Sequence, residues 1–206
     1  MALKRVPLGQ RQALFRLGGW LTIAIGLTTI LRTGGHLWDG LAYAALVLLS
    51  LALLARPLQP VWPQLLPWRR GIGLVGFGLA VAHSLQSVAH HWQWRWHTWR
   101  FLIMQHQVAV GLGLLALILL LPAASTSFGR AQQSLGHWWR RLHLLTLPAL
   151  LLALAHATLI SGRFLGGTRL LLSHRLLTLA IIALGVAILW LRTTWGTAWV
   201  RRLVKS

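Results

Sequence analysis

Long apolar runs alternate with short polar connections along the chain. Each run approaches the ~20 apolar residues that a helix needs to cross the hydrocarbon of a bilayer. The pattern predicts six transmembrane helices, at roughly residues 17–31, 41–54, 72–89, 101–121, 142–160 and 176–191. Because the connections are brief, we expect an all-α integral membrane bundle that forms a single domain over residues 1–206.

The composition supports a membrane protein. The chain of 206 residues is 56% hydrophobic, with a mean hydropathy of +0.65. Its charged fraction is 10%, far below the roughly 25% of soluble domains, and this excludes an ordinary water-soluble fold. The absence of cysteine excludes disulfides and thiolate metal sites. No small-residue cleavage site ends the first apolar run, so we expect it to be a retained helix.

The charge is strongly positive, with twenty Lys and Arg residues against one acidic residue, Asp39. Such a charge can indicate nucleic-acid binding, but the cations lie in the connections between apolar runs. This distribution is typical of topology determinants and of contact with anionic lipid, so no nucleic-acid partner is expected. Fourteen of the twenty lie on the side that holds both termini. Both termini are therefore predicted to be cytoplasmic, in a bacterial inner membrane.

A glycine-rich stretch, residues 71–76, matches the letters of the G-x-G-x-x-G dinucleotide fingerprint. That fingerprint requires a preceding strand and a following acidic residue, and the sequence has neither. Gly73, Gly76, Ala80 and His83 instead share one face of the third predicted helix. Small residues on such a face allow close helix packing. They also leave room for a flat macrocycle beside His83, and both interpretations stay open.

Three histidines lie within the apolar runs: His83, His143 and His156. Neutral imidazole is a strong ligand of haem iron, and polar groups inside a bilayer usually have a function. His83 and His156 lie about 20 and 22 Å beyond the paired arginines that precede their helices. The matched depth predicts one haem between them. His143, nearer the cytoplasmic surface, is a candidate ligand of a second haem, with His137 as its nearest conceivable partner.

His143 and His156 lie about 140° apart on an ideal helix. Pro148 stands between them and can kink the helix, so they share a face only if the helix is distorted. Otherwise they serve different partners.

The remaining polar groups have weaker interpretations. His106, between Gln105 and Gln107, is expected at a haem edge, a quinone or a water-exposed cap. Arg70 and Arg141 are expected to be topology anchors, or else partners of haem propionates or of an acidic protein. The tryptophans of residues 92–99 are expected to be interfacial anchors or a stacking platform. With one acidic residue, carboxylate-based catalysis is excluded, and no catalytic residue is assigned.

Two segments resemble the ferric reductase-like transmembrane family. One is Arg69-Arg70-Gly71-Ile72-Gly73-Leu74 leading to Ala82-His83-Ser84, which looks like the third helix of that family. The other is Leu135-Gly136-His137-Trp138-Trp139-Arg140-Arg141-Leu142-His143, followed by His156, which looks like its fifth helix. Within the family, the order and spacing are most similar to the MsrQ (YedZ) group of haem-binding membrane subunits of protein-methionine-sulfoxide reductase systems.

The resemblance implies electron transfer through one or two b-type haems. The donor would be a cytoplasmic flavin reductase or quinol, with FMN, FAD or quinone supplied by a partner. The acceptor outside would be a sulfoxide reductase subunit or ferric iron. The oxidases of the family pair their histidines differently, which makes His83–His143 and His97–His156 the alternative ligand set. Two alternatives from other classes remain: a haem-free scaffold or transporter-type bundle, and a quinone-binding membrane subunit.

Overall fold

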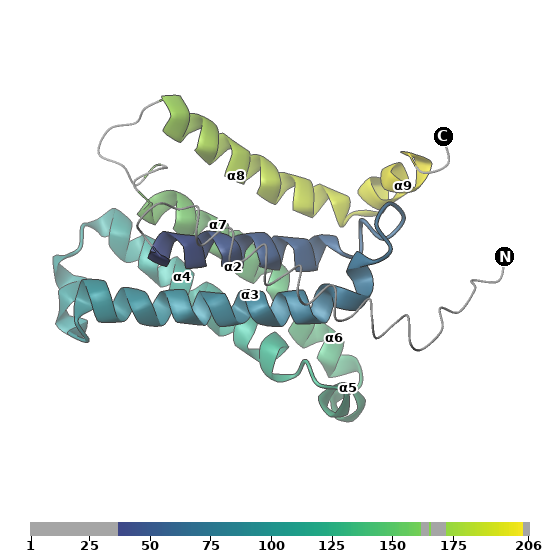
Figure 1. Ribbon diagram of the computed structural model, residues 1–206, viewed down its shortest axis with the longest axis horizontal. Helices are drawn as coiled ribbons and strands as arrows, with labels where there is room; N and C mark the ends of the chain where they lie inside the picture. The colour runs from purple at the N-terminus through teal and green to yellow at the C-terminus, as the bar shows by residue number, and fades with distance from the viewer. Residues whose placement is uncertain (1–36, 162–164, 166–171, 204–206) are drawn as a thin grey trace.

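A computed structural model describes residues 37–161, 165 and 172–203 of the chain (Figure 1). Within these residues all regular elements are helices and no strand occurs. The α-helices are α2 (Leu37–Leu54), α3 (Leu65–Ser87), α4 (Met104–Ser125), α5 (Gly129–Leu135), α6 (His137–Leu144), α7 (Thr146–Ile160), α8 (Leu172–Leu191) and α9 (Thr194–Leu203). A π-helix, η1 (Val88–Trp92), and a 3₁₀-helix, η2 (Trp96–Phe101), join α3 to α4. The predicted all-α fold is confirmed for the described residues.

Three continuous helical segments are long and apolar enough to cross a membrane: Leu65–Trp92, Met104–Ser125 and His137–Ile160. A fourth crossing is possible if α8 and α9, which meet at a bend of 89°, count as one span. The apolar part of α2, Gly40–Leu54, is shorter. The predicted span at residues 17–31 lies outside the described residues. The chain is therefore compatible with a multi-pass membrane protein, while six spans and cytoplasmic termini stay predictions.

Prolines explain two of the helix ends. α2 ends at Leu54, just before Arg56-Pro57, because the residue before a proline is driven out of the helical conformation. α6 ends at Leu144, four residues before Pro148. The ring of a proline clashes with the carbonyl four residues earlier, and the proline nitrogen has no hydrogen to donate to that carbonyl. The interruption at Leu145 therefore divides the predicted span 142–160 into α6 and α7.

The core forms where four helices meet. α2 packs along α3, and α4 packs along α7. One buried apolar cluster joins Leu53 of α2, Leu120 of α4, Leu150 of α7 and Ile188 of α8. This packing of α2 between neighbouring helices is visible in Figure 1. It brings together α3, α4 and α7, which carry the candidate site.

Large apolar side chains also cover the outside of the bundle. On α4 these include Leu114 and Ile118, and on α8 they include Leu179 and Val186. A soluble monomer rarely exposes contiguous apolar surface on this scale, but a bilayer requires it. The exposed faces of α4 and α8 are consistent with contact to lipid chains.

The bundle has two distinct ends (Figure 1). We call the end formed by residues 55–64, α5, α6 and α9 the α9 end. We call the end formed by residues 88–103, with the start of α4, the η2 end. Asp39, the acidic residue of the chain, lies within α2.

Candidate functional site: a pair of imidazoles toward the η2 end

His83 of α3 and His156 of α7 face each other inside the bundle. Their ring centroids are 6.5 Å apart and their planes meet at 68°. Two imidazoles on opposite sides of one metal ion would have centroids about 6 Å apart, because each metal–nitrogen bond is about 2 Å long and each ring adds about 1 Å. The structure thus brings the two predicted histidines to the separation of a bis-imidazole site. Their role as ligands stays a prediction.

The hydrogen bond of His156 determines which ring nitrogen is available. Nδ1 of His156 lies 2.7 Å from the carbonyl oxygen of Ala109 in α4. A carbonyl can only accept, so Nδ1 carries the hydrogen and donates it. The lone pair of the neutral ring then resides on Nε2. Metal-binding histidines commonly donate their other N–H to a backbone carbonyl in this way, which fixes tautomer and ring orientation.

Gly113 of α4 gives the His156 ring its space. A Cβ atom built at Gly113 would lie 2.8 Å from Nδ1 of His156, closer than real side-chain contacts allow. By contrast, a Cβ at Gly111 would meet only Trp99, at 3.8 Å. Neither Gly113 nor Ala109 was expected at the site from the sequence. The sequence shows two glycines close together, Gly111 and Gly113, but the role of Gly113 becomes clear only from the packing of α4 against α7.

The glycine face of α3 packs against α2. A Cβ at Gly76 would lie 3.1 Å from Leu49 and 3.2 Å from Leu48, and one at Gly73 would lie 3.6 Å from Ala52. These contacts favour close helix packing over clearance for a macrocycle at these two glycines. Any cofactor contact by Gly73 or Gly76 remains a prediction.

His143 has a different environment in α6. Its ring lies 4.1 Å from that of Trp139, with planes tilted by 35°. Its Nδ1 lies 3.0 Å from the carbonyl of Trp139, and Trp139 in turn donates from Nε1 to the carbonyl of Thr126 at 3.0 Å. His137, the candidate partner of His143, has its ring 5.2 Å from Trp138. The contacts of His143 are therefore local ones at the α9 end, made with Trp139 of its own helix.

The alternative ligand His97 lies outside the helix that carries His83. It belongs to η2, and its side chain is exposed. Between the two histidines, the chain passes through η1 and then through left-handed backbone at Gln93 (φ 47°) and Trp94 (φ 62°). The thirteen-residue separation of His83 and His97 therefore does not correspond to one regular helix. Across the described residues, no group of three or more His, Cys, Asp or Glu side chains is placed to hold a metal ion.

The Gln105-His106-Gln107 segment begins α4. The Gln105 amide donates to the carbonyls of Leu159 and Leu165, and the Gln107 amide donates to those of Trp99 and Leu102. The two glutamines thus tie α4 to neighbouring segments. His106 is half-buried, and its Nε2 is buried and has no hydrogen-bond partner in the part of the chain that the structure describes.

The two arginines expected near a cofactor contact aromatic rings. The guanidinium carbon of Arg70 lies 5.6 Å from the ring centroid of Phe128, and that of Arg141 lies 4.8 Å from the ring centroid of Trp138. Both side chains are exposed at the α9 end. These cation–π contacts account for their positions, and a role toward haem propionates stays a prediction.

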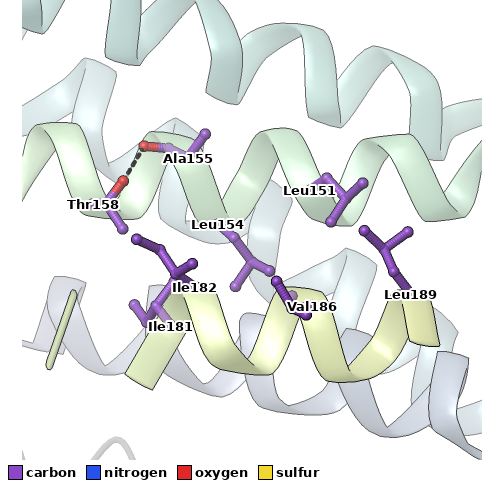
Figure 2. A pocket seen from close by; sticks show the side chains of 9 residues that line it. Leu151, Leu154, Ala155, Thr158, Ile181, Ile182, Val186 and Leu189 are labelled. Atoms are coloured by element: carbon purple, nitrogen blue, oxygen red, sulfur yellow. Dashed lines mark hydrogen bonds between the residues drawn. The ribbon is translucent and has the colours of Figure 1, made fainter. Parts of the chain in front are cut away.

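A separate pocket of about 270 Å³ lies between α7 and α8 (Figure 2). Leu151 and Leu154 of α7 face Ile182 and Val186 of α8 across it. Its polar lining side chain, Thr158, already donates to the carbonyl of Ala155 at 2.8 Å. No lining residue can bind a metal ion, so this pocket is distinct from the imidazole pair.

Comparison of the chain with family models, with curated proteins and with solved structures found no match. The resemblance to the ferric reductase-like family therefore rests on the sequence motifs of α3, α6 and α7.

Proposed function

We propose that this protein is a b-type haem membrane protein of the ferric reductase-like kind, which transfers electrons across the bilayer. The donor is a cytoplasmic flavin reductase or quinol, and the acceptor is an outer-side sulfoxide reductase or ferric iron. The observation that carries the proposal is the opposed pair of His83 and His156, 6.5 Å apart. Haem bound there supplies one-electron chemistry at iron.

Each residue of the pair has a defined task. His156 presents Nε2, because Ala109 holds its Nδ1–H by a bond of 2.7 Å. His83 lies on a separate helix, α3, which packs with α7 against α2 and α4, and it would supply the second imidazole. Both rings are partly buried among apolar helices, and neutral imidazole is the form that binds iron.

His143 is proposed as the ligand of a second haem at the α9 end. The support is its tautomer: its Nδ1 donates to the carbonyl of Trp139 at 3.0 Å, which leaves the lone pair on Nε2. His143 differs from His156 in its neighbouring ring, which is that of Trp139 rather than an imidazole. A count of one or two haems per chain decides this point.

A quinone-binding role is the second candidate, and one observation favours it. Nε2 of the His106 ring is buried without a hydrogen-bond partner among the described residues, and a quinone oxygen can accept from a ring N–H. The neighbouring glutamine amides are already bonded to backbone carbonyls. A quinone at this position would be retained when His83 or His156 is replaced, whereas haem at the imidazole pair would not.

Electron transfer across a sealed vesicle tests the proposed function. The purified, haem-supplied protein is reconstituted into vesicles that enclose ferricyanide, and dithionite is added outside. We expect ferricyanide reduction well above that of empty vesicles, together with a b-type reduced-minus-oxidised spectrum. Vesicles that carry the His156→Ala variant should behave like empty ones. Haem-free protein with no transfer would overturn the proposal and favour the scaffold or transporter-type alternative.

A further inference from the structure

Three arginines from separate segments converge at the α9 end. Arg56 follows α2, Arg69 lies near the start of α3, and Arg192 follows α8. Arg192 donates from Nη1 to the carbonyl of Leu53 at 3.4 Å, which ties the end of α8 to the end of α2. The ends of α2 and α3 meet in a second buried cluster that contains Ala55 and Leu65. The helix ends that carry the three arginines are therefore held near one another by the packing of their helices.

This cluster has no carboxylate side chain to neutralise it. The positive charges of Arg56 and Arg192 act on Arg69. Burial, and secondarily the charge of Arg56, lower the pKa of the Arg192 guanidinium. The only acidic residue of the chain, Asp39, lies fourteen residues before Leu53 in α2, about 21 Å away along the helix. Arg69 and Arg192 are half-buried and Arg56 is exposed beside them. Like charges in partly buried positions are unfavourable unless an anion compensates them.

The α8–α9 bend indicates the depth of this cluster. The two helices meet at 89°, and a Cβ at Gly196 would overlap the carbonyl oxygen of Trp190, so glycine is needed for the turn. On α9, Trp195 and Trp199 are exposed while Val200 is buried. An amphipathic helix with outward tryptophans, perpendicular to an apolar helix, is typical of the membrane–water interface. These features favour an interfacial α9 over one bent span formed by α8 and α9, and an interfacial α9 would place Arg192, at the bend, at the level of lipid phosphates.

We propose that Arg56, Arg69 and Arg192 bind one phosphate group at the α9 end. Guanidinium groups match phosphate oxygens with paired N–H donors, and such charge-assisted bonds are stronger than neutral ones. At headgroup depth the phosphate belongs to a phospholipid, and soluble phosphate offers the same chemistry. The bound phosphate would join α2, α3 and α8 at the point where their charges otherwise repel. This inference does not depend on haem binding.

The test measures thermal unfolding and retained lipid for the full chain in detergent. Phosphatidylglycerol is the lipid probe, diacylglycerol of the same acyl chains is the control without phosphate, and inorganic phosphate at matched ionic strength is the soluble probe. The variants are Arg56→Gln and Arg69→Gln. Arg175→Gln is the matched control, because Arg175 is exposed near the start of α8, far along that helix from Arg192.

We expect phosphatidylglycerol to stabilise the unsubstituted chain and the Arg175→Gln variant equally. Diacylglycerol should stabilise neither protein. The Arg56→Gln and Arg69→Gln variants should need about tenfold more phosphatidylglycerol, because each loses one charge-assisted contact. An equal gain with inorganic phosphate would assign the site to soluble phosphate. A response to phosphatidylglycerol alone would assign it to lipid.

The direction of the stability change provides a second criterion. If phosphate is bound, removing Arg56 or Arg69 in lipid-containing detergent lowers the unfolding temperature. If no anion is bound, the same change relieves repulsion and raises it. A raised unfolding temperature, or a phosphatidylglycerol response equal to that of Arg175→Gln, would overturn the proposal.

Discussion

The histidines at the two ends of the bundle differ in what surrounds them. His156 donates to the carbonyl of Ala109 on another helix and faces a second imidazole, that of His83. His143 bonds the carbonyl of Trp139, four residues earlier in its own helix, and stacks on the Trp139 ring. The same side chain, in the same tautomer, is thus part of a tertiary arrangement at one end and of a local one at the other.

This difference shows that a tautomer alone does not make a metal site. A ligand needs a free nitrogen lone pair and also an opposing group across the metal position. His156 has both features among the described residues. His143 has the free lone pair, but the ring beside it is the indole of Trp139 rather than a second imidazole. We therefore expect the pair toward the η2 end to bind haem more tightly than the α9 end does.

Alanine substitution should separate the two ends most clearly. We expect His156→Ala to lose one haem per chain, because an axial ligand disappears from the centre. We expect His143→Ala to leave that haem in place, because His143 does not contact the pair. The measurement is haem content per purified chain, with size-exclusion profiles as the control for folding.

The comparison would fail if His143→Ala removed the same haem as His83→Ala. That result would favour the alternative pairing, in which His83 binds with His143 and His156 binds with His97. Loss in His97→Ala would identify the second ligand of that arrangement.

A smaller effect is expected from the glycines of α4. Gly113→Ala places a methyl group 2.8 Å from Nδ1 of His156, whereas Gly111→Ala meets only Trp99 at 3.8 Å. Both changes improve helix propensity by a similar amount, about 1 kcal/mol, so they form a matched pair. Overpacking at Gly113 costs about 1–3 kcal/mol and displaces His156 or α4.

We therefore expect Gly113→Ala to shift the haem reduction potential or weaken haem retention, while Gly111→Ala changes neither. Potentiometric titration and haem washout measure both quantities. Identical behaviour of the two variants would mean that the close approach of α4 to His156 has no influence on the site.

Much of the architecture was predictable, because the length of an apolar run indicates whether a helix can cross a membrane. The predicted spans at residues 72–89, 101–121 and 142–160 each fall largely within a helical segment long enough to cross a membrane. Their ends were less predictable. α3 begins at Leu65, before the predicted start at residue 72. The helix continues beyond its apolar residues, so the arginines that precede them are also helical.

The site was predictable only as far as sequence spacing reports depth. Counting residues from the paired arginines placed His83 and His156 at one level, and the structure brings them together. The partner of His156 was not predictable, because it is a backbone carbonyl, which any residue at position 109 would supply. The glycine face of α3 was recognised, but only the position of α2 reveals what it packs against. The pairing of His143 with Trp139 follows from the four-residue spacing of a helix.

The most direct test of the central claim is the spin state of the ferric protein by electron paramagnetic resonance. The account predicts a low-spin, six-coordinate haem in the unsubstituted chain. His83→Gly and His156→Gly should each convert it to high spin, and added imidazole should restore the low-spin signal in both. A low-spin signal that survives both substitutions would contradict the assignment of His83 and His156 as the opposing ligands.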